Sequence, residues 1–544
     1  MEILQTKNLD HLGIVMGTLK KFSVIDFVNQ KLGHNEQHHV SAGEVLAAMV
    51  LNGLGFVSRP LSLTPQFFET KALDVLFGRE IQPDKLNRHR LGRVLDDIHG
   101  YGCELLYSEI ALHICEQIEL KQKFTSLDTT SFSVSGEYDV DSDEKTINVS
   151  RGYSKDHRPD LKQVVLELVT SHDGGLPLMM QCFDGNASDT KIFKTRCEQL
   201  RKSFKQAEGP QYLVGDSKLY CAGNAAQLRQ LKFITRIPRT YKDERAAVDI
   251  AIAEDRWINA GVGEKYHVHI IEHLGIEQRW LVIHSESAKA RSEKTLDKQI
   301  KKEILAINRA LMHLRNKTFS CETEAINAIK TLSASFKYHD LSIDKLIKKE
   351  CYAGVGRPKK GEEPTGIIYQ VIGESKKLDS VRQTLLTQRS CYIIGTNTTT
   401  DELTNEEVLE AYKNQNASVE RGFRFLKDPQ FFVSSFFVKK PSRIMSLLMI
   451  MTLSLLIYSV TQKHLREQLL LLDETLPNQI NKPIKNPTMR WVFQIMEGIH
   501  VVYVRINGVI TKHFTGINDL KRKIIRFFFH DVHLIYDVGN DNIH

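Results

Sequence analysis

The sequence of 544 residues lacks the paired cysteines that build zinc sites and disulfide frameworks. Its eight cysteines are scattered without a C-x-x-C pair, and its 21 histidines include no H-E-x-x-H motif. These absences argue against a structural zinc site and against a disulfide-stapled secreted fold, so we expect a cytoplasmic protein. The first residues contain no basic stretch that leads into an apolar run, so no signal peptide is predicted.

Long apolar runs are also scarce. The single candidate is residues 444–460 (IMSLLMIMTLSLLIYSV), a run of 17 residues that contains four serines and threonines. A membrane-spanning helix needs about 20 predominantly apolar residues, so this run is at the short end of that range. We therefore predict a buried core helix here and no membrane partner.

The chain carries a small excess of positive charge, which is distributed unevenly along the sequence. The chain has 73 Lys and Arg against 66 Asp and Glu, which gives a net charge of +7. Residues 421–544 carry 17 basic against nine acidic residues, whereas residues 1–420 sum to −1. A clustered positive charge indicates a polyanion partner, usually nucleic acid. The alternative is a basic surface that is only solvated.

The first 120 residues have a helical pattern. Apolar residues recur at helical spacing in 40–56, where Ser41 is a candidate N-cap, and again in 91–118. Several short helices with glycine breaks suit a helix-turn-helix-like unit that reads DNA, and they equally suit a plain helical bundle.

From residue 121 the pattern changes to strands. Residues 123–134 are rich in Thr, Phe and Val, and 161–171 and 176–183 flank an H-D-G-G turn that predicts an antiparallel hairpin. A helix is predicted over 187–204, and short buried strands over 211–215 and 232–236. Hairpin strands followed by a helix and single strands indicate a mixed α/β sheet.

Residues 240–389 have a different character. Alternating strands are predicted at 266–271 and 279–283, followed by a long charged helical stretch over 287–332. The sheet is expected to resume at 390–395. A strong helix then begins at Thr404, which is capped with Glu407 three residues on.

Three carboxylates occupy positions that suggest chemistry. Asp128 lies inside an apolar strand, Asp216 ends another strand, and Glu420 lies on the helix predicted over 404–427. Acids at such strand positions are costly unless they are paired or bound to metal. Mg²⁺ prefers carboxylate oxygens and serves phosphoryl transfer. For each acid taken singly, a structural role is the alternative.

The helix around Glu420 carries cations beside the acid. Arg424 is four residues and Lys427 seven residues after Glu420, and seven residues differ by about 20° around a helix. An acid beside cations that bind phosphate suits a metal-dependent phosphodiester site. Surface ion pairing along the helix is the alternative.

An ordered set of motifs resembles a known family. The set is SLDTTSF, GYSKDHRPDLKQ, FDGNASD, YLVGDSKLY, FITRIPR and VERGFRFLKD. It is similar to the DDE transposases of bacterial insertion sequences, in the group with a Tyr–Arg–Glu–Lys helix signature, over about residues 120–460. The stretch LDHLGIVMGTLKKFSVIDFVNQKLG also resembles the helical region that precedes the core in one branch of this family.

The resemblance implies a site, a fold and an activity. Asp128, Asp216 and Glu420 match the acids that hold two Mg²⁺ ions, for which Mn²⁺ can substitute, on a ribonuclease-H-like fold. Lys427 matches the lysine that contacts transposon-end DNA. The implied function is binding of terminal inverted repeats, DNA cleavage and strand transfer by a homodimer on double-stranded DNA. The alternatives are a metal nuclease without strand transfer and a non-catalytic DNA-binding descendant.

Two positions of the signature depart from the family pattern. The nearest tyrosine, Tyr412, is eight rather than seven residues before the glutamate, and Asn416 stands where the family has arginine. An amide can bond a phosphate or a base but brings no charge. We expect Arg421 or Arg424 to supply the missing charge.

Three regions thus accompany the two parts of the expected core. We predict a helical N-terminal domain at 1–120 that binds DNA ends, and the first part of the ribonuclease-H-like core at 121–239. A β-rich insertion with long helices follows at 240–389. The second part of the core spans 390–465, and a basic region at 466–544 is expected to contact DNA or the dimer partner.

Further contacts with DNA are expected outside the Glu420 helix. Relatives stack a tryptophan of the insertion on a flipped base, so Trp257 and Trp280 are candidates, with core packing as the alternative. Tyr153, Lys155 and Arg158 in the GYSKDHRPD motif are expected to touch DNA near the cut. An exposed loop is the alternative for these three.

Overall fold

The architecture comes from a computed structural model of the chain. The described residues are 2–33, 38–56, 60–118, 120, 123–134, 138, 146–156, 158–188, 192–193, 196–197, 200, 211–354, 360–361, 363–415, 419–429 and 438–538. The chain forms two compact units. Unit 1 comprises Met1–Thr235 with Thr400–His544, and unit 2 comprises Arg236–Thr399.

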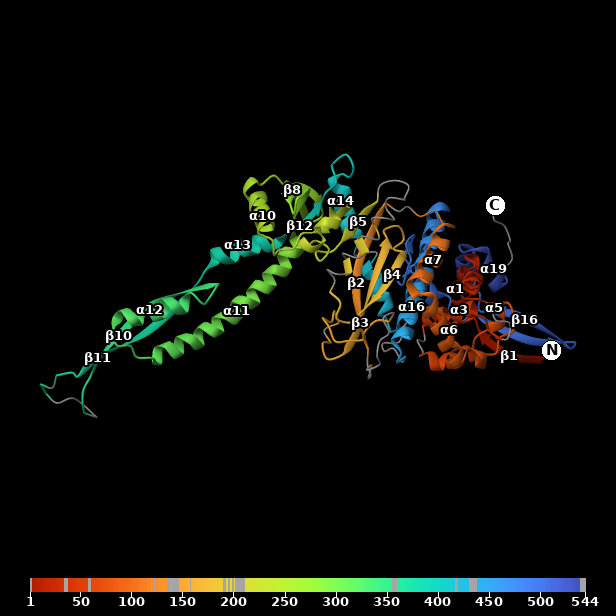
Figure 1. Ribbon diagram of the computed structural model, residues 1–544, viewed down its shortest axis with the longest axis horizontal. Coiled ribbons are helices and arrows are strands. Elements are labelled where there is room, and N and C mark those ends of the chain that lie inside the picture. Colours follow the sequence, from red (N-terminus) through yellow and green to blue (C-terminus); the bar gives the residue numbers. More distant parts are fainter. Residues whose placement is uncertain are drawn as a thin grey trace. The chain divides into compact units, whose positions relative to one another are not determined.

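The sheet of unit 1 has the strand order β4-β3-β2-β5-β6 (Figure 1). Strands β2, β3 and β4 pair antiparallel, and β5 and β6 continue from β2 in parallel. Three hairpin strands followed by two parallel ones are the ribonuclease-H-like arrangement, so the predicted fold class is confirmed. The strands span Phe124–Val134 (β2), Lys162–Ser171 (β3), Pro177–Phe183 (β4), Tyr212–Gly215 (β5) and Lys232–Arg236 (β6).

The predicted hairpin is formed by β3 and β4. Its turn contains Gly174 and Gly175, both with positive φ of 75° and 66°. Glycine adopts this conformation without steric cost, which explains why the H-D-G-G sequence reverses the chain here. The Ser171 hydroxyl also donates a hydrogen bond to the Asp173 carbonyl at 2.7 Å.

The N-terminal region is mainly helical, as predicted. Helix α3 begins with a capping box in which the Ser41 hydroxyl and the Glu44 carboxylate each accept the other residue's backbone N–H. Helices of this region are α1 (Leu12–Lys21), α2 (Val24–Leu32), α3 (Ala42–Leu54), α4 (Thr64–Glu69), α5 (Leu73–Phe77), α6 (Arg88–Tyr101) and α7 (Cys103–Cys115), with 3-10 turns at Leu61–Leu63 and Pro83–Leu86.

The two ends of the chain meet in unit 1. Strand β1 (Glu2–Asn8) pairs antiparallel with β15 (His500–Ile506), which pairs with β16 (Val509–Thr515). The helical pattern of residues 1–120 did not predict β1, because the strand with which it pairs, β15, lies almost 500 residues away. The C-terminal part also contains β13 (Leu476–Pro477), β14 (Pro483–Ile484), α17 (Met489–Ile495), α18 (Asp519–Arg526) and α19 (His530–Tyr536).

The apolar run of 444–460 lies within helix α16 (Pro441–Leu471). This helix is long and apolar enough to cross a membrane, but 83% of its most apolar window is buried inside the protein. It packs against α3, α6, α7 and β4 in the main hydrophobic core of unit 1. The prediction of a buried core helix is confirmed.

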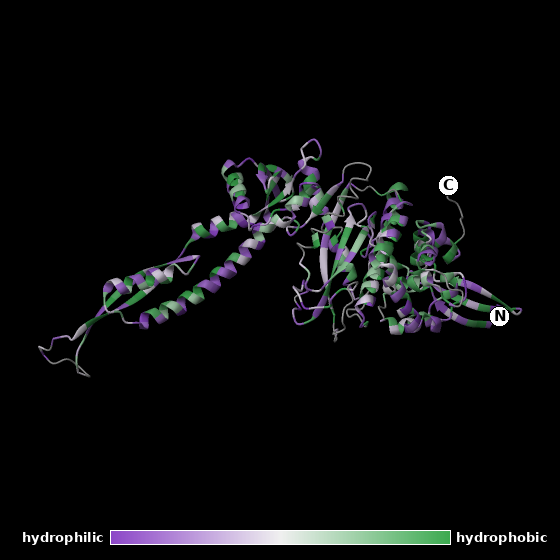
Figure 2. Cartoon of the chain, viewed as in Figure 1, coloured by the Kyte–Doolittle hydropathy of each residue, from purple (hydrophilic) through white to green (hydrophobic). Residues whose placement is uncertain are grey.

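Unit 2 contains an antiparallel sheet and a long helical arm. Its sheet has the order β12-β9-β8-β7, and α11 leads from β9 toward the hairpin of β10 and β11 (Figure 1). Hydrophilic residues occur along the whole of α11 (Figure 2). The elements are α10 (Lys242–Glu254), β7 (Ile258–Gly261), β8 (Glu264–His273), β9 (Ile276–Ser285), α11 (Glu286–Asn316), α12 (Glu322–Ser333), β10 (His339–Cys351), β11 (Gly366–Lys377), α13 (Asp379–Ser390) and β12 (Cys391–Thr396).

Buried histidines make the fold of unit 1 sensitive to acid. His11 is buried, donates a 2.8 Å hydrogen bond from its Nε2 to the Leu54 carbonyl, and stacks on Phe493. Burial lowers the pKa of His11 to about 4, and burial likewise lowers the pKa of His172 and of His464 to about 4. In the unfolded chain these imidazoles titrate near the ordinary histidine value of about 6.5.

We therefore expect stability to fall as the pH drops from about 6.5 to 4. In that window the unfolded chain binds protons that the folded chain does not, which costs about 1.4 kcal/mol per pH unit for each histidine. Urea unfolding at pH 7 and pH 5 measures the loss. His11→Gln should reduce this pH dependence by roughly 2 kcal/mol, whereas His89→Gln, at an exposed histidine, should leave it unchanged. An equal pH dependence in all three proteins would contradict the role of His11.

Candidate active site

Two of the predicted acids lie at neighbouring positions of the sheet. The parallel pairing of β2 with β5 ends at the pair of Leu127 and Gly215; Asp128 is the next residue of β2, and Asp216 directly follows the end of β5. Neighbouring strands are about 4.8 Å apart, and residues in the same register face the same side. This pairing places the backbones of Asp128 and Asp216 next to each other, although the two residues are 88 positions apart in the sequence.

Asp128 is held by its own strand and by a lysine. Its Oδ1 accepts the backbone N–H of Thr129 at 2.7 Å and lies 3.7 Å from the Nζ of Lys155. Lys155 also donates to the Thr129 hydroxyl at 2.7 Å. The predicted DNA-contacting residue Lys155 therefore lies directly beside the predicted catalytic acid.

Asp216 organises the turn that follows β5. Its Oδ1 accepts the backbone N–H of Lys218 at 2.9 Å, and its carbonyl accepts the Thr235 hydroxyl of β6 at 2.8 Å. The Nζ of Lys218 lies 5.8 Å from the centre of the Tyr153 ring, which is 82% exposed. Tyr153 is thus brought to the turn that carries the second acid.

Glu420 lies at the N-terminal end of the short helix α15 (Arg421–Leu426). The structure contradicts a single α-helix over 404–427: α14 spans Asn405–Gln415, and a π-helical turn at 419–420 precedes α15. The predicted capping box at Thr404 is confirmed. A π turn changes the rotation per residue, so α-helical arithmetic does not relate Tyr412 on α14 to Glu420. Asn416 lies outside the described residues.

The cations after Glu420 have separate partners. Arg424 donates to the Glu420 carboxylate at 3.2 Å, as the spacing of four residues predicts. The Lys427 Nζ donates to Asp156 at 2.6 Å and lies 5.6 Å from the Phe132 ring centre. Lys155 and Asp156 therefore connect the strand of Asp128 with the end of α15. Arg158 instead forms an exposed pair with Asp160 at 2.7 Å.

The structure does not gather all three acids into one ligand set. Among the described residues, no group of three His, Cys, Asp or Glu side chains could hold a metal ion. The carboxylates of Asp128 and Glu420 each face a cation of this chain, Lys155 and Arg424. The chemistry of the pair Asp128 and Asp216, which offers hard oxygen donors from adjacent strands, still fits Mg²⁺.

The two tryptophans of unit 2 differ in accessibility. Trp280 is fully buried, donates to the Gln278 side chain at 2.9 Å and packs beside His273. This placement favours the core role for Trp280, because no face of its ring is open to a base. Trp257 is half-buried, with the Nζ of Lys265 4.7 Å from its ring centre.

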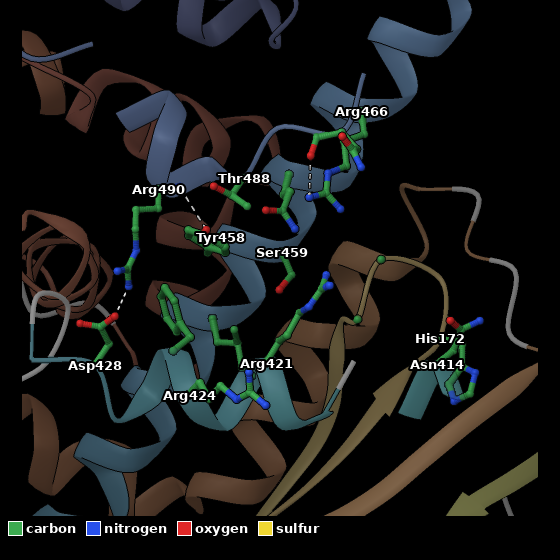
Figure 3. A pocket seen from close by; sticks show the side chains of 17 residues that line it. His172, Asn414, Arg421, Arg424, Asp428, Tyr458, Ser459, Arg466, Thr488 and Arg490 are labelled. Atoms are coloured by element: carbon green, nitrogen blue, oxygen red, sulfur yellow. Dashed lines mark hydrogen bonds and ion pairs between the residues drawn. The ribbon is translucent and has the colours of Figure 1, made fainter. Parts of the chain in front are cut away.

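An arginine-lined pocket lies on the other side of α15. It has a volume of about 640 Å³ and is formed by α14, α15, α16, the β3–β4 turn and residues 486–490 (Figure 3). Four arginines line it together with Tyr458 and Phe425; they are Arg421, Arg424, Arg466 and Arg490. The sequence analysis missed Arg466 and Arg490, since only folding places them beside the Glu420 helix.

The pocket concentrates positive charge. Asp428 is the acid that lines it, and this carboxylate pairs with Arg490 (Figure 3). Burial, followed by the like charge of Arg421, lowers the pKa of Arg466. Arg466 is oriented by the carbonyl of Pro487, to which its Nε donates at 3.0 Å. An anion in this pocket would relieve the repulsion between Arg421 and Arg466.

Comparison with known protein families decides the identity of the core. The family model described as "Transposase DDE domain" matches residues 119–457, more than half of the chain. The chain belongs to the DDE transposases. A second model, a domain of unknown function (DUF4277), matches residues 4–112 of the transposase, its helical N-terminal region.

Other comparisons are more distant. No curated protein matches the transposase. Among solved structures, it is similar to a chain of the "Cryo-EM structure of piggyBac transposase synaptic complex with hairpin DNA", at 8% sequence identity and a TM-score of 0.35, over 91% of this chain and 82% of that one. The family assignment rests on the sequence match of the DDE domain.

The position of the Lys155 ammonium beside Asp128 predicts that it competes with a divalent metal ion for this carboxylate. Replacing Lys155 by methionine removes a positive charge beside Asp128, so a bound Mg²⁺ should stabilise Lys155→Met more than the wild type. Thermal unfolding with and without MgCl₂ measures this difference. Arg158→Met, in the same loop but paired with Asp160, is the matched control. Equal stabilisation of all three proteins would show that Lys155 does not occupy the space that the metal needs.

Proposed function

We propose that this DDE transposase binds the terminal inverted repeats of its own element and catalyses Mg²⁺-dependent cleavage and strand transfer of DNA. The observation that supports the proposal is the register of β2 and β5, whose last pair, Leu127 and Gly215, comes one residue before Asp128 and Asp216; Lys155 lies beside Asp128. Adjacent carboxylates next to cations suit a reaction at a phosphodiester, because the phosphorus centre and its oxygens need both kinds of group.

Asp128, Asp216 and Glu420 are proposed to hold two divalent ions. When bound, Mg²⁺ lowers the pKa of an attacking hydroxyl and neutralises charge on the leaving oxygen. Glu420 joins the two aspartates only if its carboxylate leaves Arg424, which is 78% exposed and thus free to reorient toward solvent. Manganese, with similar oxygen preference, is proposed to substitute.

The reaction is proposed to proceed by direct in-line attack. A water oxygen, and later the freed 3′-hydroxyl, forms a bond to phosphorus while the opposite P–O bond breaks and the leaving oxygen takes a proton. No covalent bond between protein and DNA forms in this scheme. The chain's own task is to orient the phosphodiester, for which we propose Lys155 beside Asp128, Lys218 beside the exposed ring of Tyr153, and Lys427, which pairs with Asp156.

Residues on and around α15 are proposed to add further contacts with DNA. Arg421 and Arg424 are proposed to bind phosphate in the pocket behind α15, in place of the missing family arginine at Asn416. Tyr412, Arg158 and Trp257 are also proposed to contact DNA. Two transposon ends require two catalytic sites, so a homodimer on paired ends is proposed, in the cytoplasm and at the nucleoid when bound to DNA.

Removing a carboxylate charge should separate cleavage from binding. Asp128→Asn, Asp216→Asn and Glu420→Gln should each abolish Mg²⁺-dependent cleavage of the terminal repeats, because the amide does not bind the ion strongly. Binding of the same DNA, measured by fluorescence anisotropy, should remain largely intact. The control Asp160→Asn changes a nearby exposed acid and should keep cleavage. Full cleavage by Asp128→Asn would refute the assignment of the site.

The same cleavage reactions also test for strand transfer. A tagged end fragment that becomes joined to a target plasmid shows strand transfer, whereas nicked product alone supports a metal nuclease. If no variant and no wild-type sample cleaves but all bind, the non-catalytic alternative holds.

The pocket arginines should contribute to the salt dependence of end binding. Each phosphate contact contributes about 0.9 to the slope of log affinity against log salt, so Arg421→Ala/Arg466→Ala should reduce the slope by roughly 2. The control is Arg505→Ala/Lys523→Ala, which removes two exposed cations that already pair with Glu2 and Glu474. Circular dichroism checks that both double variants fold. An unchanged slope in the pocket variant would exclude a phosphate from the pocket.

A further inference from the structure

Helix α11 of unit 2 presents one basic face to solvent. Counted from Lys298 at about 100° per residue, Arg291, Lys294, Lys302 and Arg309 all lie within about 40° of one line along the helix. All five side chains are exposed. Lys301, about 60° from the line, widens the same face, which we call the outer face of α11.

The opposite side of α11 packs on its own unit. Its buried residues, Leu296, Ile300 and Ile307, lie about 160–200° from the Lys298 line. Ile307 belongs to the small core formed with α12 and the β10–β11 hairpin. The orientation of the helix is therefore set by apolar burial, and the outer face is turned away from that core.

The acids of α11 do not neutralise the outer face. Asp297 accepts Arg382 at 2.9 Å, and Glu303 accepts the backbone N–H groups of Lys337 and Tyr338. Both acids, like the two other acids of this helix, lie about 100° or more from the Lys298 line. Within the described part of the chain, the five cations of the outer face form no ion pair.

The surrounding segment is basic as well. Residues 286–377, from the start of α11 to the end of β11, contain 19 Lys and Arg against 12 Asp and Glu, a net charge of +7. The sum of −1 over residues 1–420 concealed this segment, because acidic stretches elsewhere offset it. The C-terminal region is thus not the sole basic part of the chain.

We propose that the outer face of α11 is a second DNA-binding surface, which contacts the phosphates of a DNA duplex independently of sequence. From Arg291 to Arg309 the face is about 27 Å long, which matches roughly eight base pairs. The inference rests on the proposed action of this chain on DNA, and it adds a contact in unit 2 that the catalytic residues of unit 1 do not provide.

Two exposed apolar residues accompany the cations. Leu305 and Met312 are 61% and 66% exposed and lie on the same face. Two such side chains bury too little apolar surface for an interface between two copies of this chain. The five cations on each copy would also repel one another. Duplex DNA is therefore the occupant that the charge favours.

The test compares two triple variants of the full chain. Lys294→Gln/Lys298→Gln/Lys302→Gln removes three charges from the outer face and keeps good helix formers. Lys85→Gln/Lys289→Gln/Lys377→Gln removes three exposed lysines that already pair with acids. Anisotropy titrations at several salt concentrations use a duplex of mixed sequence without terminal repeats, in the Asp128→Asn background so that no DNA is cut.

Loss of three phosphate contacts should reduce the slope of log affinity against log salt by roughly 2 to 3, and the control should keep the parent slope. Equal slopes in the parent and in the outer-face variant would overturn the inference and leave the proposed function standing. A changed oligomeric state with an unchanged slope would overturn it too, in favour of contacts between copies. If the parent binds no DNA at any salt concentration, the proposed function itself fails.

Discussion

The burial of α16 is the interaction on which unit 1 depends. This apolar helix packs on α3, α6 and α7 of the N-terminal region and on β4 of the sheet, so it joins both parts in one core. Helix α15 docks on it closely: a Cβ at Gly422 would lie 3.0 Å from Leu455, and the Phe425 and Tyr458 rings are 4.7 Å apart. Glu420 is thereby attached to the same core as the sheet that carries Asp128 and Asp216.

The segment of residues 153–156 links the parts of the site. Tyr153 meets Lys218 beyond β5, Lys155 faces Asp128 on β2, and Asp156 binds Lys427 at the end of α15. Each of these contacts pairs a group of this loop with a different element. The cations Lys155, Lys427 and Arg424 are thus each paired with an acid of the chain, which is Asp128, Asp156 and Glu420 respectively.

Local sequence patterns predicted local structure well. The H-D-G-G turn predicted the β3–β4 hairpin, Ser41 and Thr404 predicted helix starts, and the 444–460 run predicted a core helix. These features depend on residues close in sequence. Strand β1 was missed because its partner β15 is non-local. The continuous helix over 404–427 was wrong, because periodicity does not reveal a π turn at 419–420.

By itself, the sequence determined the family, the ribonuclease-H-like class and the three acids expected to be catalytic, because the order of motifs and the alternation of apolar residues can be read without a structure. Tertiary structure alone decided which groups meet. It paired β2 with β5 up to the residues just before Asp128 and Asp216, assembled arginines from α15, α16 and residue 490 around one pocket, and buried Trp280. Packing also buried Leu296, Ile300 and Ile307 on one side of α11 and left the basic side exposed. Contacts between residues distant in the chain arise only from packing, so no local pattern contains them.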